Sequence, residues 1–261
     1  MTRHFPKRTD PTLLVEGAKS VISLLYNYYT GRMQKDPVAP VLSRYAYGKD
    51  YHHVMKDKMK RLFDFIQREA GEARGRIFVD SAPVLERAWA REAGLGWIGR
   101  NSCLISRHAG SFVFIGEIIL DLELEYNRVR VNDLCGSCTR CIDACPTGAI
   151  LPDRTIDSGR CISYQTIENR GQIPRELTGK LVSRVFGCDI CQDVCPWNRK
   201  AREHDEPAFE PVAGLLEMSR EDWHGLDRNR YDRLFSGSAV QRAGYEKLKS
   251  NLEFLSGETG T

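Results

Sequence analysis

Eight of the nine cysteines lie between positions 135 and 195, at spacings typical of iron–sulfur proteins. The first run reads C-x2-C-x2-C-x3-C-P and the second C-x2-C-x3-C-P, with one cysteine between them. In order, they are Cys135, Cys138, Cys141, Cys145, Cys161, Cys188, Cys191 and Cys195. Iron–sulfur clusters are held by thiolates, and short loops let backbone N–H groups reach the sulfurs. The pattern therefore predicts an electron-transfer protein with two 4Fe–4S clusters.

The ligands can be divided between the clusters. In two-cluster ferredoxins the cysteine before proline binds the other cluster. The first cluster then takes Cys135, Cys138, Cys141 and Cys195. The second takes Cys188, Cys191 and Cys145 and lacks one thiolate. Cys161 is the unassigned cysteine nearby, so we assign it to the second cluster.

The alternative to clusters is structural zinc, which also takes C-x2-C pairs. Zinc requires neither the triple run nor the C-P ending, so the pattern favours clusters. Cys103, in Asn101-Ser-Cys-Leu-Ile, is interpreted as a buried small hydrophobic residue.

Composition excludes several classes of protein. The 38 lysines and arginines nearly balance 35 aspartates and glutamates, so the chain is no polycation. There is no apolar run of about 20 residues, as a bilayer span requires. The start, MTRHFPKRTD, lacks the apolar region of a signal peptide. We therefore expect a cytoplasmic protein, in which a reducing environment disfavours disulfides.

The elements before the cysteines indicate a layered α/β core over roughly the first 130 residues. Expected strands are 21–25, 77–79 and 112–124, and expected helices are 55–71 and 81–94. Gly94, Gly96 and Gly99 follow a helix and not a strand, which argues against a dinucleotide-binding turn. They either allow close approach to a flat cofactor or form a helix cap and a turn. Short helices are expected after Pro196.

Three segments before the cysteines, taken together, resemble the epoxyqueuosine reductase family. They are Ser43-Arg-Tyr-Ala-Tyr-Gly-Lys-Asp-Tyr-His52, Val79-Asp-Ser-Ala-Pro-Val-Leu-Glu-Arg87 and Gly94-Leu-Gly-Trp-Ile-Gly-Arg-Asn101. The resemblance implies a cobalamin-dependent enzyme with two 4Fe–4S clusters. It would reduce epoxyqueuosine at the wobble position of transfer RNA to queuosine, the last step of queuosine synthesis, with electrons from an external low-potential donor.

The resemblance also implies a fold. We expect an α/β (α+β) cobalamin-binding catalytic domain over residues 1–131, similar to those of reductive dehalogenases and the human cobalamin-processing protein. A ferredoxin-like two-cluster module would follow over residues 132–198, and a short helical tail over residues 199–261. A monomer without a membrane segment is expected.

The family's proton donor corresponds to Asp80, at the end of an expected strand. Reducing an epoxide takes two electrons and two protons and releases water, and an alkoxide leaves poorly unless it is protonated. A carboxylic acid could supply that proton. The alternative is a helix N-cap, because Asp80 precedes Ser-x-Pro.

Other site residues are also implied by the resemblance. The candidate cobalamin contacts are Arg44, Tyr45, Tyr51, Asp80, Asn101 and Ser163. The segment 43–52 could instead meet RNA or form an ordinary polar loop. No protein ligand below cobalt is implied, and His52, His53 and His108 are interpreted as surface or hydrogen-bonding residues.

Cationic residues near and beyond the cysteines are candidates to bind transfer RNA through phosphate. These are Arg170, Arg199, Lys200 and Arg202, with Lys247 and Lys249 adding charge. The alternative is a solvated charged face.

The chain departs from the family pattern at both ends. Members usually carry a segment before the Lys7-Arg-Thr-Asp-Pro11 stretch, and many end in HEAT-type repeats that grip transfer RNA. We therefore expect a short form without those repeats. Two other functions stay open: a two-cluster electron carrier without cobalamin, and a related cobalamin-dependent reductase such as a dehalogenase. The twin-arginine signal that would favour the dehalogenase is not at the N-terminus.

Overall fold

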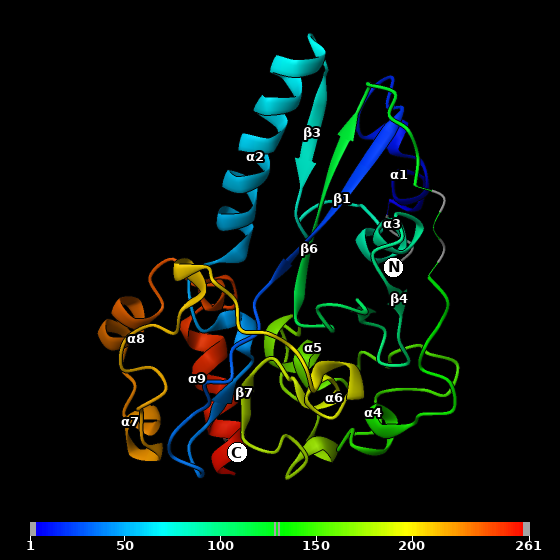
Figure 1. Cartoon of the computed structure of the whole chain (residues 1–261). Coiled ribbons are helices and arrows are strands. Elements are labelled where there is room, and N and C mark those ends of the chain that lie inside the picture. Colours follow the sequence, from blue (N-terminus) through cyan, green and yellow to red (C-terminus); the bar gives the residue numbers. More distant parts are fainter. Residues whose placement is uncertain (1–3, 128, 130, 258–261) are drawn as a thin grey trace. The chain divides into compact units, whose positions relative to one another are not determined.

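A computed structural model describes residues 4–127, 129 and 131–257 (Figure 1). The chain divides into two compact units, each built from separate stretches. The first unit comprises residues 1–27, 51–99 and 103–136, and the second comprises 28–50, 100–102 and 137–261. Residues 28–50 therefore group with the cysteine-rich and C-terminal segments. The expected boundaries near 131 and 198 stay a prediction.

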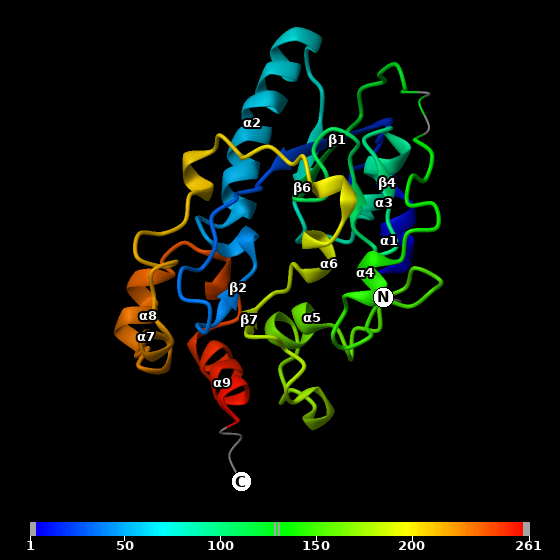
Figure 2. The same ribbon diagram turned by 60° about the horizontal axis from the view of Figure 1, so that its bottom comes forward.

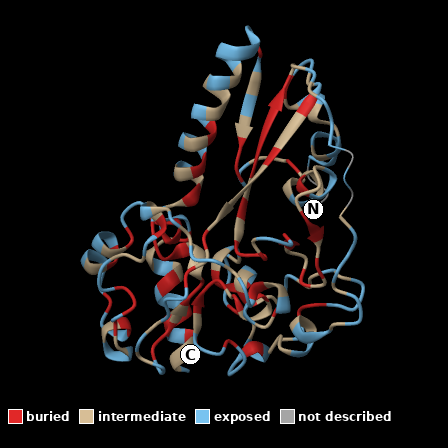
Figure 3. Ribbon diagram, in the orientation of Figure 1, coloured by how far each residue is buried: buried red, intermediate tan, exposed pale blue. Residues whose placement is uncertain are grey.

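The first unit is built on a three-stranded antiparallel sheet of order β1-β6-β3. The strands are β1 (Ser20–Asn27), β6 (Val113–Leu120) and β3 (Gly75–Phe78). The central strand β6 is buried over most of its length (Figure 3). The register pairs Glu117 of β6 with Ser23 of β1 and with Phe78 of β3, so an acidic side chain stands in the middle of an apolar sheet.

Helix α2 (Tyr51–Ala70) covers one face of this sheet (Figures 1 and 2). Its apolar side buries Met55 and Met59 while the opposite side is exposed. A Cβ on Gly116 of β6 would lie 2.5 Å from the Met59 sulfur, so this glycine lets the helix approach the strand. The helix ends as expected at Gly71, whose φ of 84° favours glycine.

Helix α3 (Glu86–Glu92) covers the other face. Side chains from the loop before it, from β3 and from β6 form a small core there with Trp89. Its buried members are Val15, Phe78, Val84 and Ile119. The short helices α1 (Phe5–Thr9) and η1 (Pro11–Leu13) precede β1, and β4 (Trp97–Ile98) pairs with β5 (Leu104–Ile105).

The expected helix start at Ser81 is wrong. Residues 81–85 form tight turns, with Ser81 N–H donating to the Val79 carbonyl at 2.6 Å and Val84 N–H to the Ala82 carbonyl at 2.8 Å. The helix begins at Glu86 with Leu85 as its N-cap. Asp80 therefore caps no helix. The expected strand 112–124 is also shorter, since β6 ends at Leu120.

The second unit contains little sheet. Strand β2 (Val41–Leu42) pairs in parallel with β7 (Arg184–Phe186). Its α-helices are α4 (Arg140–Asp143), α5 (Ile162–Ile167), α6 (Ile190–Asp193), α7 (Arg220–His224), α8 (Arg228–Leu234) and α9 (Tyr245–Ser256). Its 3-10 helices are η2 (Arg44–Ala46), η3 (Arg175–Leu177), η4 (Pro196–Asn198), η5 (Pro207–Phe209) and η6 (Ala239–Arg242).

The short helices expected after Pro196 are present and bury large side chains. Trp223, Phe235 and Leu248 pack in one core with Val185 and Phe186 of β7. The C-terminal segment therefore completes the core around β7. Over the described ranges, no helix is long and apolar enough to cross a bilayer.

Candidate active site and iron–sulfur ligands

Asp80 stands just beyond β3 in a backbone conformation that few residues other than glycine adopt, with φ of 50°. Its carboxylate accepts a hydrogen bond from the Tyr51 hydroxyl at 2.5 Å, and His52 Nε2 lies 3.8 Å from the same oxygen. The side chain is 55% exposed, whereas Tyr51 is buried. The turn thus presents an oriented carboxyl group to solvent.

The Tyr51 ring is fixed by stacking. It lies nearly parallel to Phe114 of β6, with centroids 4.1 Å apart and planes 5° apart. On the same helix, His52 stacks on Tyr51 at 4.1 Å. Stacked aromatic rings hold a side chain in one orientation. The Tyr51 hydroxyl can therefore hold the Asp80 carboxylate in place while leaving its other oxygen available, an arrangement suited to a general acid.

Two more carboxyl groups belong to this part of the first unit. Glu117 is fully buried, and burial raises its pKa to about 9, with smaller contributions from the charges of Glu86 and Asp80. Glu86, at the start of α3, is half-buried, and burial raises its pKa to about 7. Sequence reasoning missed both, although an acid within the apolar run Val113–Leu120 was a signal.

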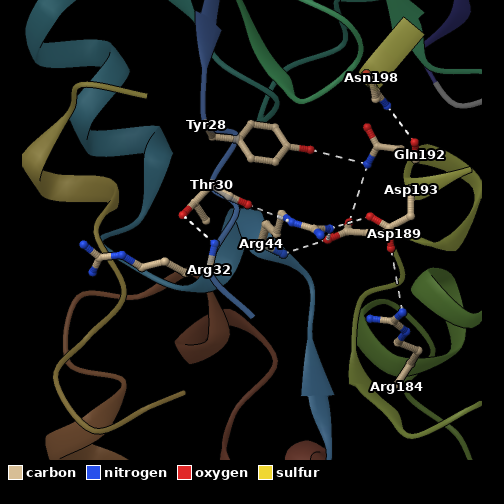
Figure 4. A network of polar contacts seen from close by, with 9 residues as sticks. All are labelled: Tyr28, Thr30, Arg32, Arg44, Arg184, Asp189, Gln192, Asp193 and Asn198. Carbon is tan, nitrogen blue, oxygen red and sulfur yellow. Dashed lines mark hydrogen bonds and ion pairs between the residues drawn. The ribbon is translucent and has the colours of Figure 1, made fainter. Parts of the chain in front are cut away.

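Arg44 lies in a polar network of the second unit (Figure 4). Its guanidinium bonds to Asp193 at 2.6 Å and lies 3.5 Å from Asp189, and its Nε–H donates to the Thr30 carbonyl at 3.1 Å. The Arg44 backbone N–H donates to Asp189 at 2.8 Å. Burial raises the pKa of Asp189, and these Arg44 groups oppose that effect. Arg44 therefore anchors its segment to the second cysteine run.

The other candidate cobalamin contacts lie at separate places. Tyr45 packs against Phe186 with centroids 6.1 Å apart. Asn101 is buried, and Ser163 is half-buried in the first turn of α5, which begins directly after Cys161. Tyr51 contacts Asp80, as described above. The contacts of these residues with cobalamin stay a prediction.

Two of the loop glycines have internal roles. Gly94 has φ of 78° after the C-cap of α3, and a Cβ on Gly96 would collide with the Ile105 carbonyl oxygen of β5. The conformation of Gly94 and the close approach at Gly96 agree with the second alternative, a helix cap and a turn. The loop places Trp97, whose indole N–H donates to the Cys135 sulfur at 3.4 Å.

The two cysteine runs share one backbone pattern, offset by 50 residues. Helices α4 and α6 each have four residues, and Cys145 N–H and Cys195 N–H donate to carbonyls three residues before them at 3.2 and 3.1 Å. Their environments differ. Burial tends to raise the pKa of Cys145, but hydrogen bonds from Thr147 and backbone N–H groups lower it, whereas burial raises the pKa of Cys188 to about 11.

The surroundings of the cysteine sulfurs include a donor of the kind found in iron–sulfur proteins. The nine cysteines, all within the described ranges, are not joined in disulfides. Within residues 4–127, 129 and 131–257, no three His, Cys, Asp or Glu side chains come together as ligands of one metal ion. The Ala149 N–H at 3.3 Å from the Cys145 sulfur is the kind of donor that tunes a cluster.

The candidate cations of the second unit are accessible. Arg170, Arg199, Lys200 and Arg202 are all exposed. Lys247 is half-buried, and burial together with the charge of Arg170 lowers its pKa. Lys249 is exposed, as are His53 and His108, while His52 contacts Asp80.

Several known proteins similar to this chain are named epoxyqueuosine reductase. A family model described as a 4Fe-4S double cluster binding domain matches residues 134–198, and one described as epoxyqueuosine reductase QueG matches residues 8–81. The epoxyqueuosine reductase of Cellulophaga algicola is 52% identical over 255 residues, covering 98% of this chain and 83% of the relative. That of Escherichia coli is 39% identical, covering 97% and 68%.

Solved structures agree. An epoxyqueuosine reductase crystallised with an epoxyqueuosine-modified tRNA-Tyr stem loop has a TM-score of 0.88 and 31% identity, covering 96% of this chain and 67% of that one. The Bacillus subtilis enzyme, with its catalytic aspartate loop swung out of the active site, has a TM-score of 0.87 and 30% identity, covering 96% and 67%. The chain belongs to the epoxyqueuosine reductase family.

Proposed function

We propose that this protein reduces epoxyqueuosine in transfer RNA to queuosine, with electrons passing through two 4Fe–4S clusters. The observation that carries the proposal is the Asp80 carboxylate held by Tyr51 in a chain that also has both cysteine runs. Relatives at 39–54% identity bear the name of this activity. A similar structure holds a tRNA stem loop with the modified base.

Asp80 is the proposed proton donor. As the epoxide C–O bond breaks, the ring oxygen gains charge, and a carboxylic acid at hydrogen-bond distance can neutralise it. The Tyr51 hydroxyl orients the carboxylate. In the Bacillus subtilis relative, a catalytic loop that carries an aspartate is swung out of the active site. The complete reaction takes two electrons and two protons and releases the oxygen as water.

Cobalamin is the proposed second cofactor, within the catalytic α/β domain. When bound, it would supply strongly reduced cobalt to the epoxide carbon. Tyr51 and Asp80 lie together in the first unit. Asn101 and Ser163 remain candidate contacts on the strength of the family resemblance, each with a polar side chain suited to corrin amides. Arg44 and Tyr45 would act by ordering their segment, because the Arg44 guanidinium is 11% exposed and ion-paired.

The cluster ligands are proposed as the sequence divides them. Cys135, Cys138, Cys141 and Cys195 would bind the first cluster, and Cys145, Cys161, Cys188 and Cys191 the second. An external low-potential donor would supply the electrons. Exposed Arg170, Arg199, Lys200 and Arg202 would contact tRNA phosphates. We propose that the protein is a monomer and that it works in the cytoplasm, where its transfer RNA substrate is found.

The test compares wild type with Asp80→Asn under anaerobic conditions. Both should retain cluster and corrin absorption after cobalamin is offered and the excess removed. Turnover of epoxyqueuosine-containing tRNA should fall by at least about 100-fold in the variant. Asp64→Asn is the matched control, since that aspartate is 39% exposed and pairs with Lys60 on α2. Clusters without retained corrin would favour an electron carrier, and undiminished turnover would remove Asp80 from its role.

A further inference from the structure

The second cysteine run carries two acidic side chains among its proposed cluster ligands. Asp189 directly follows Cys188, and Asp193 lies two residues after Cys191. The Asp189 side chain is 3% exposed and that of Asp193 is 31% exposed. A 4Fe–4S cluster becomes more negative when it gains an electron, so negative charge held nearby and away from water opposes reduction. Without compensation, these two carboxylates would make the second cluster harder to reduce.

The first run does not have this pair of acids. The corresponding positions, 50 residues earlier, hold Thr139 and Asp143, and both are exposed. The Thr139 hydroxyl donates to the Asp143 carboxylate at 2.7 Å, so a neutral group stands where the second run has an acid. Water screens an exposed charge such as that of Asp143. The two runs therefore share a backbone pattern, but the second one buries more negative charge.

Arg44 brings positive charge to both acids of the second run (Figure 4). Its guanidinium is 11% exposed and lies 2.6 Å from Asp193 and 3.5 Å from Asp189. The Arg184 guanidinium lies 3.8 Å from the other oxygen of Asp193 and is 18% exposed. Two carboxylates and two guanidinium groups together carry no net charge. Loss of either arginine would leave one uncompensated negative charge beside the second cluster.

The position of the Arg44 guanidinium is also fixed by groups other than the two acids. Its Nε–H donates to the Thr30 carbonyl at 3.1 Å. The preceding residue, Ser43, lies so close to Gly187 that a Cβ on this glycine would collide with the Ser43 hydroxyl. Gly187 directly precedes Cys188, so the segment that carries Arg44 packs on the start of the second run. The charge is therefore held in one place relative to the cluster ligands.

We propose that Arg44 sets the reduction potential of the second cluster, because its buried charge offsets Asp189 and Asp193 and so keeps that cluster reducible by the external donor. This inference rests on the part of the proposed function that assigns a 4Fe–4S cluster to the second run. Arg44 acts through the field of its charge and need touch neither substrate nor cofactor. One electron passes from the donor to the cluster, and no bond or proton changes at Arg44.

An anaerobic redox titration of the cluster-loaded protein, read by electron paramagnetic resonance, tests this role without turnover. The signal that Cys161→Ser alters identifies the second cluster. At the wild-type midpoint, Arg44→Met should lower the ratio of reduced to oxidised second cluster about tenfold, or about 59 mV for one electron. Arg44→Lys keeps the charge and should titrate close to wild type. Arg32→Met is the matched control on the same segment, because its ion pair with Glu210 is exposed.

Asp193→Asn gives a test of the sign, including the case in which Arg44→Met fails to hold its clusters. Removing one acid should raise the potential of the second cluster, whereas removing Arg44 should lower it. A merely structural disturbance would not produce opposite shifts. An unchanged potential in Asp193→Asn, or equal shifts in Arg44→Met and Arg44→Lys, would overturn the electrostatic role. A wild type that shows the expected shifts against its variants but does not reduce epoxyqueuosine would overturn the proposed function alone.

Discussion

Glu117 in the first unit and Asp189 in the second are acidic side chains with at most 2% of their surface exposed, yet their surroundings are opposite. Asp189 accepts the Arg44 backbone N–H, lies 3.5 Å from the Arg44 guanidinium and precedes α6 (Figure 4). Glu117 faces Ser23 with no hydrogen bond to its carboxyl oxygens in the described chain. The paired acid holds a loop together, whereas burial without a partner raises the pKa of Glu117 to about 9.

This contrast assigns the two acids different consequences for stability. A buried charge that is paired becomes strongly destabilising only when its partner is removed. A buried acid without a partner destabilises the fold as it stands, so its removal should stabilise the protein. Variants that disturb each acid should therefore shift stability in opposite directions.

The largest effect is expected from Arg44→Met, which removes the partner and leaves Asp189 buried. We expect the free energy of unfolding to fall by roughly 3 kcal/mol. Anaerobic thermal unfolding followed by circular dichroism should show a Tm lower by roughly 6–12 °C. Arg32→Met is the matched control, because its ion pair with Glu210 is 61% and 47% exposed. Equal shifts in the two variants would mean that burial of the Arg44 pair does not matter.

Asp189→Asn is expected to have a smaller effect of the same sign. The amide can still accept the Arg44 backbone N–H, but the ion pair is lost, so we expect a loss of roughly 1–2 kcal/mol. The same measurement on Asp193→Asn is the comparison, since Asp193 is 31% exposed and should matter less. A stabilised Asp189→Asn would contradict the structural role.

Glu117→Gln replaces a carboxyl group by an amide, as Asp189→Asn does, but it should raise the free energy of unfolding instead of lowering it. Below pH of about 4.5 the acid is neutral in both folded and unfolded chains, so the variant should gain little. As pH rises toward 9, the unfolded chain ionises and the folded chain does not, so wild type loses stability and the variant does not. We expect an advantage of up to roughly 3 kcal/mol at pH 7, because that pH lies about 2.5 units above the unfolded pKa and each unit corresponds to about 1.4 kcal/mol.

Thermal unfolding at pH 5 and pH 8 measures this difference. The gap in Tm between Glu117→Gln and wild type should widen at the higher pH, while Glu92→Gln, at an exposed position of α3, should follow wild type at both. A gap that is independent of pH would show that Glu117 is not a neutral acid in the folded protein.

Local patterns predicted much of this molecule. The cysteine spacing foretold two similar loops, the apolar spacing of Met55 and Met59 foretold α2, and Gly71 foretold its end. The family motif singled out Asp80, and its turn conformation contradicts the helix-cap alternative. These features depend on neighbours in sequence.

Long-range pairing was out of reach of sequence reasoning. Tyr51 and Asp80 are 29 residues apart, and Arg44 and Asp189 are 145 apart, so only the folded chain joins them. Glu117 was passed over because strand periodicity marks a position as inward-facing without saying which partners it meets. The role of Gly96 was ambiguous for the same reason, since the group that excludes a side chain there is the Ile105 carbonyl, which is distant in sequence.

The smallest effect is expected at Trp97, a buried residue whose hydrogen-bond acceptor is a cysteine sulfur. The Trp97 indole N–H donates to Cys135, so Trp97→Phe should destabilise the reduced, more negative first cluster. A lost hydrogen bond of this kind should lower its potential by roughly 20–40 mV. Trp223→Phe is the control, because the buried Trp223 indole N–H has no partner within the described ranges. An anaerobic redox titration read by electron paramagnetic resonance should show the shift in Trp97→Phe alone, and equal potentials in both variants would remove this bond from cluster tuning.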